Sequence, residues 1–402
     1  MTEGAAEPAA QLQGPRVLAA LIVGQLGVHA AMAGLRMAAP LQSLREGHSA
    51  WAVGVLMALF AAAPVLLALH AGRLADRLGY HRPVHIAAAM SFVGIALAAL
   101  SSLLPPGTLH FALLCIGATL TGSGANMGML TIQRTAGLAA RDATERMRIF
   151  SWLGVAPSFA NVVGPVAAGL MIDATGFTGA YLLLLLLPVG TVLSARLVPR
   201  MAPRPVAVTT DRTALDLFRL PGFRRLMLIN WLLSMCWDVH SFAVPILGHE
   251  RAFSASTIGL VLGTFTLAVT GVRLLVPLLA HRLEEVTVLR GAMLATGVVF
   301  ALYPLAGTPW LMGGCAVLLG LSLGAVQPMI MTTLHQLTPD DRHGESLALR
   351  SMTINASSTV MPLLFGAAGS VVGAAVLFWT VGAAVGAGSW LAVRLRELTR
   401  VA

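Results

Sequence analysis

The sequence lacks several residues on which common protein chemistries depend. It contains no lysine, because all 26 residues counted as Lys or Arg are arginine, and only 11% of its residues are charged. Its three cysteines, at positions 115, 236 and 315, lie in apolar runs without metal-ligand spacing, so neither a disulfide framework nor a metal site is expected. No glycine-rich phosphate loop and no nucleophile beside a base occur between those runs. We therefore expect no cofactor and no enzymatic activity.

Apolar sequence is what the chain has in abundance. Hydrophobic residues make up 57% of it and the mean hydropathy is +0.81, whereas a soluble domain carries about 25% charged residues. A chain this apolar cannot hide its surface from water by folding on itself, so the lipid bilayer must act as its solvent. The alternating polarity of outer-membrane barrel strands is absent from the sequence.

The net charge of +9 does not indicate nucleic-acid binding, because the arginines follow membrane topology. With both termini in the cytoplasm, most arginines lie in cytoplasmic loops or at the helix ends beside them, as the positive-inside rule requires. Arg45 and Arg251 are expected on the outer side of the membrane, and Arg36 and Arg273 lie within predicted spans. The first apolar run is expected to be an uncleaved signal-anchor. We therefore expect a multi-pass protein of the bacterial inner membrane, in contact with lipid and not with nucleic acid.

Twelve apolar runs, each near the roughly 20 residues that span a bilayer, divide the chain. Six lie in residues 1–198 and six in 225–402, and the segment 199–224, rich in proline and arginine, is expected to be a cytoplasmic linker. We predict an all-α polytopic membrane protein with 12 transmembrane helices in two six-helix pseudo-symmetric bundles. The runs fall near 17–40, 50–71, 83–104, 109–133, 149–172, 178–198, 225–247, 256–280, 287–306, 309–335, 347–369 and 371–393.

The second half of the chain repeats part of the first at a shift of 205 residues. Residues 39–78 align with residues 244–283 without a gap, and Gly54 meets Gly259 in that alignment. Two alike halves in a bilayer are the plan of a secondary transporter whose site lies between them.

The loop after the second apolar run reads GRLADRLGYHRP. This resembles the cytoplasmic signature of the major facilitator superfamily, and the length, the twelve runs and the central loop agree with that family. The resemblance implies two bundles that rock about a central site, and a loop that latches the halves on the cytoplasmic side in the outward-open state. An aspartate here can face a helix N-terminus, which carries about half a positive charge. The alternative is a positive-inside anchor with no switching role. The latch residues would be Gly72, Asp76, Arg77, Gly79 and Arg82.

The fifth apolar run is similar to the glycine-proline motif of drug:proton antiporters, which favours export over import. Glycine and proline there give a bend and a close helix contact. The match is partial, because Ala168 stands in for a glycine. On the fourth run, Ala118 stands where many proton-coupled drug exporters carry an arginine. The residues of the motif are Gly154, Gly164, Pro165 and Gly169.

Polar residues recur at helical spacing on the runs that line the central cavity of this family, which are the first, fourth, seventh and tenth. On the first run they lie at i, i+4 and i+11, so they share one face. The shift of 205 residues brings the seventh run into register with the first. We expect the following residues, with Arg273 of the eighth run, to bind the substrate: Gln25, His29, Arg36, Asn126, Asn230, Trp237, Ser241 and Gln327.

Asp238 is the carboxylate that we place well inside a span. A charge within the bilayer costs at least a few kcal/mol, so its presence is a functional hypothesis by default. We expect Asp238, with His240, to be the proton-coupling site. The alternative is a fixed ion pair or hydrogen bond with Arg36 or with His240.

The sequence predicts a secondary active transporter of a small organic solute, most consistent with proton-coupled efflux by a monomer. The alternative is an organic-anion exchanger or importer in which Arg36 and Arg273 clamp the anion, because guanidinium grips carboxylate through two hydrogen bonds. A third class, a receptor or an integral membrane enzyme, has no supporting motif, and its loops are too short for a catalytic domain.

Overall fold

The computed structural model describes residues 15–139, 143–200, 214–279, 284–339 and 342–399, and within these ranges it is helical without strands. The helices are α2 (Pro15–Arg45), α3 (Ala50–Leu78), α4 (His81–Ser101), α5 (Thr108–Ala139), α6 (Ala143–Ala195), α7 (Pro221–Glu250), α8 (Ala255–Leu279), α9 (Glu285–Leu302), α10 (Pro309–Gly324), α11 (Val326–Leu337) and α12 (His343–Thr399). Two short 3-10 helices, η2 (Ala214–Arg219) and η4 (Tyr303–Leu305), complete the set.

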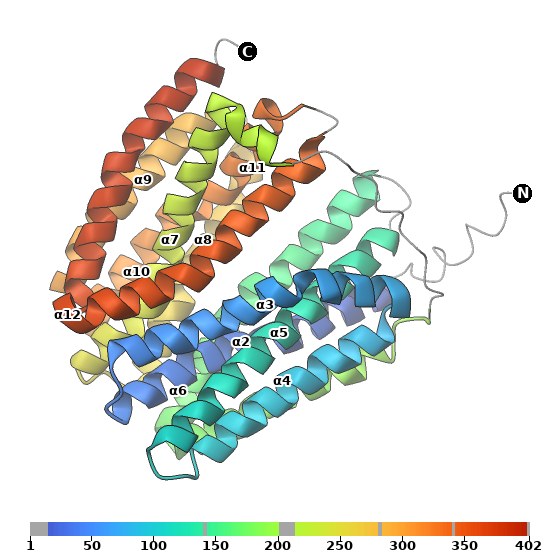
Figure 1. Cartoon of the computed structure of the whole chain (residues 1–402), viewed down its shortest axis with the longest axis vertical. Helices are drawn as coiled ribbons and strands as arrows, with labels where there is room; N and C mark the ends of the chain where they lie inside the picture. Colours follow the sequence, from blue (N-terminus) through green and yellow to red (C-terminus); the bar gives the residue numbers. More distant parts are fainter. Residues whose placement is uncertain (1–14, 140–142, 201–213, 280–283, 340–341, 400–402) are drawn as a thin grey trace, which may run out of the picture. The chain divides into compact units, whose positions relative to one another are not determined.

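The described helices accommodate the twelve predicted crossings. Nine are long and apolar enough to span a bilayer, and α3 adds a further apolar helix. Two of the nine, α6 and α12, contain a glycine with a positive φ, Gly176 at 81° and Gly373 at 82°, so each consists of two helices. Figure 1 shows α12 turning back on itself. The fold class read from the sequence is therefore confirmed.

The predicted tenth span differs from a single straight helix. It is broken at Ala325 into α10 and α11, and Pro328 lies in the first turn of α11. A proline lacks the N–H that would bond the carbonyl four residues earlier, and its ring clashes with that carbonyl. Proline also marks helix starts, because Pro15, Pro221 and Pro309 lie at or next to the first helical position.

The described chain forms two compact units. Unit 1 contains Met1–Glu46, Leu59–Val208 and Ser254–Gly259, and unit 2 contains Gly47–Ala58, Thr209–Phe253 and Leu260–Ala402. Each unit thus takes one short helical segment from the other half of the chain. The start of α3 belongs to unit 2 and the start of α8 belongs to unit 1.

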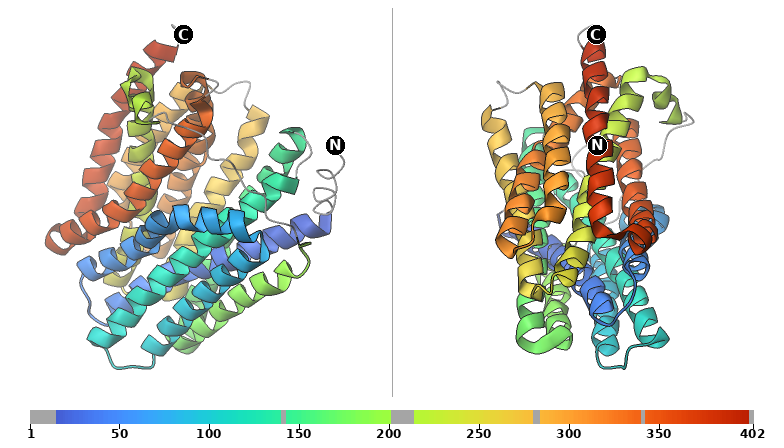
Figure 2. Two further views of the ribbon diagram at one scale, coloured as in Figure 1. Left: turned by 45° about the vertical axis from the view of Figure 1, so that its right-hand side comes forward. Right: turned by 90° about the vertical axis from the view of Figure 1, so that its left-hand side faces the viewer.

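Within each unit the long helices pack side by side. In unit 1, α2 packs mainly against α6, and α4 packs against α5; in unit 2, α12 packs against both α7 and α9 (Figures 1 and 2). A buried apolar cluster at one end of unit 1 joins four of its helices and includes Val17, Leu21, Val84, Ile132 and Leu153.

Large apolar side chains also cover the outer faces of the helices. Examples are Phe92 on α4, Leu186 on α6 and Leu274 on α8, which are 42%, 64% and 66% exposed. Patches of this kind are costly in water but favourable in lipid, so the exposed faces agree with a membrane-embedded protein.

Candidate functional site

The polar stripe of α2 lies in the interior of unit 1. Gln25 is fully buried, and neither atom of its side-chain amide has a hydrogen-bond partner among the described residues. His29 and Arg36 are half-buried farther along α2, and Arg36 lies close enough to act electrostatically on His29. On α5, Asn126 is also half-buried. A buried amide without a partner costs about 1–3 kcal/mol, which makes Gln25 a candidate for contact with solute or water.

Three of the four glycine-proline motif residues of α6 lie at close helix contacts. A Cβ at Gly164 would lie 2.5 Å from the carbonyl oxygen of Ala30 on α2. At Gly169 a Cβ would overlap the carbonyl oxygen of Ala255 on α8, and the carbonyl oxygen of Pro165 occupies the corresponding place beside Gly259. These residues let α6 approach two neighbouring helices backbone to backbone.

Gly154 differs from the other motif residues. A Cβ at Gly154 would meet no atom within 4 Å, so close helix packing does not explain this glycine.

A carboxylate fixes the same contact between α6 and α8. The backbone N–H groups of Ala255 and Ser256 donate to Asp173 of α6 at 3.0 and 2.7 Å. Asp173 therefore satisfies two of the N–H groups left unpaired at the start of α8, where the helix dipole favours a negative charge.

The structure does not describe the side chains of three of the five predicted latch residues. Gly72, Asp76 and Arg77 are helical in α3, but nothing is described of their side chains. Gly79 has a φ of 71° between α3 and α4, a conformation that glycine adopts without strain, and Arg82 is exposed.

In unit 2, Asp238 of α7 faces α12. Its side chain is 3% exposed, and the hydroxyl groups of Ser357 and Ser358 donate to its two carboxylate oxygens at 3.0 and 3.1 Å. Neither serine is among the site residues predicted from the sequence. Their signal was weak, because adjacent serines in an apolar run often bond their own helix.

His240 lies two residues farther along α7 and has a different partner. Its Nε2 is 2.9 Å from the hydroxyl of Tyr303, and its ring packs 4.3 Å from that of Phe265. Phe265 also packs against Trp237, at 4.6 Å between ring centroids. Two more α7 residues belong to the expected site: Asn230 is buried with an unpartnered Nδ2, and Ser241 is half-buried.

Arginine and amide groups meet beside α8. Nη2 of Arg273 donates to Oε1 of Gln327 on α11 at 3.0 Å. Arg350 of α12, which is not among the site residues predicted from the sequence, lies within electrostatic reach of Arg273. The Nε atoms of both arginines are buried without a hydrogen-bond partner among the described residues.

Arg36, the other half of the predicted anion clamp, belongs to unit 1, whereas Arg273 belongs to unit 2. The clamp between them therefore stays a prediction.

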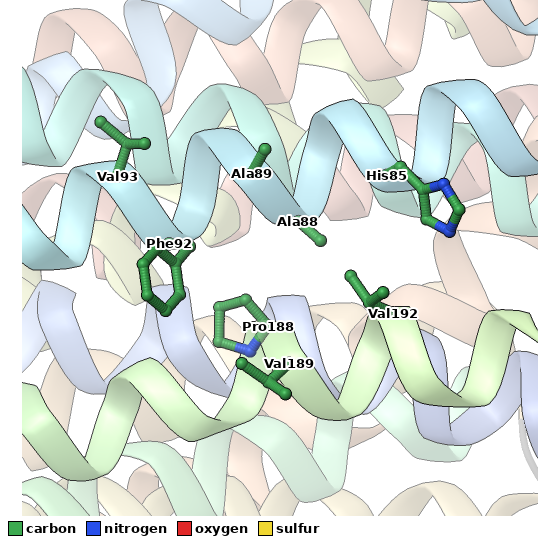
Figure 3. Close-up of a pocket in the computed structure, with 8 residues that line it drawn as sticks. All are labelled: His85, Ala88, Ala89, Phe92, Val93, Pro188, Val189 and Val192. Carbon is green, nitrogen blue, oxygen red and sulfur yellow. The ribbon is translucent and has the colours of Figure 1, made fainter.

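A separate apolar groove of about 280 Å³ lies on unit 1 between α4 and the second helix of α6 (Figure 3). Phe92 and Val93 line one side, Pro188 and Val192 line the other, and His85 lies at one end. It contains none of the residues expected to bind substrate. Its composition suits a lipid chain rather than a polar solute.

Comparison with known proteins places the chain in a family. The sequence profile described as Major Facilitator Superfamily matches residues 21–225 and 226–401. The enterobactin exporter EntS of Shigella flexneri is 27% identical over 315 residues, which cover 76% of this chain and 73% of the relative. The MFS-type transporter YhhS of Escherichia coli is 24% identical over 362 residues, covering 87% and 85%.

Solved structures agree at the level of the fold. A POT family transporter in complex with 5-aminolevulinic acid has a TM-score of 0.77 at 13% identity, covering 96% of this chain and 97% of the other. A bacterial homologue of the iron transporter ferroportin, in its inward-facing state, has a TM-score of 0.74 at 18% identity, covering 95% and 99%.

Proposed function

The chain belongs to the major facilitator superfamily, and we propose that it exports a small organic solute across the bacterial inner membrane in exchange for protons. Membership makes it a multi-pass membrane transporter and not an enzyme. The enterobactin exporter among its relatives supports outward transport. The close contacts made by Gly164 and Gly169 support the same direction, because the segment that contains them resembles, in part, the motif of drug:proton antiporters.

The observation that carries proton coupling is the environment of Asp238. A carboxylate buried in a membrane-spanning helix is costly and is a functional candidate by default. Its neighbours Ser357 and Ser358 carry hydroxyl groups, and a hydroxyl group can both donate and accept hydrogen bonds. They can donate to the ionised carboxylate and accept from the protonated one. The site therefore tolerates both protonation states that a coupling residue must adopt.

Alternating access would arise from tilting of two rigid halves, residues 1–198 and 225–402. The linker 199–224 would join them. Asp76 and Arg77, in the last turn of α3, would latch them on the cytoplasmic side. We propose that the protein acts as a monomer with both termini in the cytoplasm.

The test uses purified protein in liposomes with an imposed pH gradient. Enterobactin is the first probe because of the relative, followed by cationic dyes and organic acids. The expected result is export driven by the gradient for at least one probe, reduced at least tenfold in Asp238→Asn. The matched control is Asp216→Asn, because Asp216 is an exposed carboxylate on η2. Undiminished gradient-driven export by Asp238→Asn would refute the assignment of the coupling site.

A second candidate, transport of organic anions, is favoured by the pair Arg273 and Arg350. Two guanidinium groups and the Gln327 amide offer several N–H donors within unit 2, and both Nε atoms are buried without a partner in the part of the chain that the structure describes. Carboxylates are the groups that such donors bind best.

Flux of organic acids separates this candidate from the first. Arg273→Gln or Arg350→Gln should abolish transport of anions and leave neutral probes unaffected. Arg290→Gln is the control, because Arg290 is exposed on α9. Equal losses for neutral and anionic probes would speak against anion recognition at these arginines.

A further inference from the structure

The apolar groove between α4 and the second helix of α6 opens on the outer surface of unit 1. Phe92, Val93 and Val189, which line it, are exposed. Figure 3 shows Phe92 of α4 pointing toward Pro188 of α6 across the groove, and His85 at the end where α4 begins. An exposed apolar groove on membrane-spanning helices borders lipid, so a lipid chain is the natural occupant.

The helical repeat places two arginines just beyond the end of the groove that His85 marks. Arg82 of α4 lies three residues before His85 and seven before Ala89, and both of these line the groove. Residues at this spacing share one helix face. Arg196 directly follows α6 and lies four residues after Val192, which lines the other side. Both arginines are exposed, and within the described part of the chain neither forms an ion pair.

The start of α4 and the end of the second helix of α6 meet at this end of the groove. The imidazole of His81 hydrogen-bonds the backbone at Ala195 and Val198. A buried apolar cluster also contains residues of both segments. Arg200 is exposed and lies within electrostatic reach of the same imidazole, so it adds a third cation here. The basic end of the groove consists of Arg82, Arg196 and Arg200.

The carboxylates whose side chains the structure describes in unit 1 lie away from this basic end. They are Glu46, which follows α2, and Asp173, near the end of the first helix of α6. The basic end instead lies beside the beginnings of these helices, because the buried cluster there includes Val17 and Leu153. The positive charge of the basic end therefore favours an anionic group from outside the protein.

The groove has the dimensions of part of one lipid leaflet. With a rise of 1.5 Å per residue, α4 advances by about 12 Å from His85 to Val93. One leaflet contributes half of a hydrocarbon core of about 30 Å, so the groove fits within it and its basic end reaches headgroup level. By the predicted topology this end faces the cytoplasm, where the leaflet carries anionic lipids.

We propose that the groove binds an anionic phospholipid, with one acyl chain between α4 and α6 and the phosphate among Arg82, Arg196 and Arg200. Guanidinium groups bind phosphate through paired, charge-assisted hydrogen bonds. The bound lipid joins α4 to the second helix of α6 at their cytoplasmic ends. The inference goes beyond the proposed function and does not depend on it, because the groove contains none of the residues expected to bind substrate or protons.

Native mass spectrometry of the full-length protein in detergent tests the recognition of charge. Phosphatidylglycerol and phosphatidylcholine with the same acyl chains are added in turn; both carry a phosphate, but choline cancels its charge. The wild type should bind phosphatidylglycerol at least about tenfold more tightly. The double variant Arg82→Gln/Arg196→Gln should bind it about 30-fold more weakly than the wild type, because each arginine near an anionic headgroup contributes a factor of about five.

The matched control is Arg224→Gln/Arg290→Gln, which removes two exposed arginines from unit 2 and should bind phosphatidylglycerol as the wild type does. Failure of the wild type to bind this lipid, equal affinity for the two lipids, or equal affinity of the two double variants would overturn the proposal.

A second pair of variants tests the apolar part of the site. Ala89→Trp places an indole in the groove and should weaken phosphatidylglycerol binding at least about tenfold, because displacing two buried CH₂ groups already has this effect. Ala295→Trp is the control, because Ala295 is exposed on α9. If Ala89→Trp does not fold, Val93→Trp fills the same groove. Unchanged affinity in a folded groove variant would show that the chain binds elsewhere and would refute the site.

Glycerol 3-phosphate separates a lipid site from a site for soluble phosphates, because it carries the phosphate without acyl chains. It should not displace phosphatidylglycerol at concentrations comparable to those of the lipid. Displacement at such concentrations would refute the lipid assignment. None of these measurements requires transport, so a protein that exports nothing would refute the proposed function and leave the lipid result standing.

Discussion

The contact of α6 with α8 gives the sharpest quantitative prediction. At Gly169 a Cβ would overlap the carbonyl oxygen of Ala255, and would lie 2.9 Å from its carbonyl carbon and 3.0 Å from Cα of Ser256. Carbon atoms pack best at about 3.5–4.0 Å, so Gly169→Ala requires the two helices to separate by roughly 0.5–1 Å. Both partners are backbone atoms of a helix and cannot rotate away.

The expected cost follows from overpacking, which typically destabilises by about 1–3 kcal/mol. Alanine is a better helix former than glycine by about 1 kcal/mol, which offsets part of this cost. The matched control is Gly154→Ala in the same helix, because a Cβ there meets nothing within 4 Å. The propensity gain is common to both variants, so Gly169→Ala should be less stable than Gly154→Ala by about 1–3 kcal/mol.

Thermal unfolding in detergent compares the two proteins under the same conditions. Gly154→Ala should unfold at or slightly above the wild-type temperature, and Gly169→Ala should unfold below Gly154→Ala. If the two variants unfold together, then α6 and α8 are not in backbone contact, and the explanation given for Gly169 is wrong.

Three further predictions concern other contacts. Gly54→Ala should lower the unfolding temperature as Gly169→Ala does, because a Cβ would overlap the carbonyl oxygen of Pro362, and equal stability to wild type would contradict this contact. Asp173→Ala should cost about 0.5–2 kcal/mol in the free energy of unfolding, because the start of α8 loses its acceptor; retention of stability would mean that water replaces the carboxylate. Tyr303→Phe should cost about 1–3 kcal/mol by leaving the buried Nε2 of His240 unpaired, and a neutral effect would mean that His240 has another partner.

The candidate site divides into a part that local sequence could indicate and a part that it could not. Asp238 was identifiable because a carboxylate in an apolar run is costly wherever the run packs. Its partners Ser357 and Ser358 lie 119 and 120 residues away, and only the packing of α7 on α12 brings them together. Arg350 was missed for a related reason: it lies near the start of its predicted span and looks like a cytoplasmic anchor.

The polar contacts of Gln42 with Glu46, His110 and Tyr181 depended even more on tertiary structure. In the sequence, Glu46 follows the first apolar run and His110 starts another, which makes both resemble ordinary residues at the membrane surface. Their separation of 64 positions, and of 139 between Gln42 and Tyr181, gives no local signal. Burial of these side chains arises only because three helix ends converge there.

The sequence alone determined the membrane environment, the helices and their approximate ends, the internal duplication and the superfamily, because hydropathy, periodicity and proline positions act within one segment at a time. Tertiary structure decided which buried polar atoms meet and which glycines lie at helix contacts. Hydrogen bonds and steric contacts of this kind depend on distances of a few ångströms between segments, and such distances are set only when the helices pack.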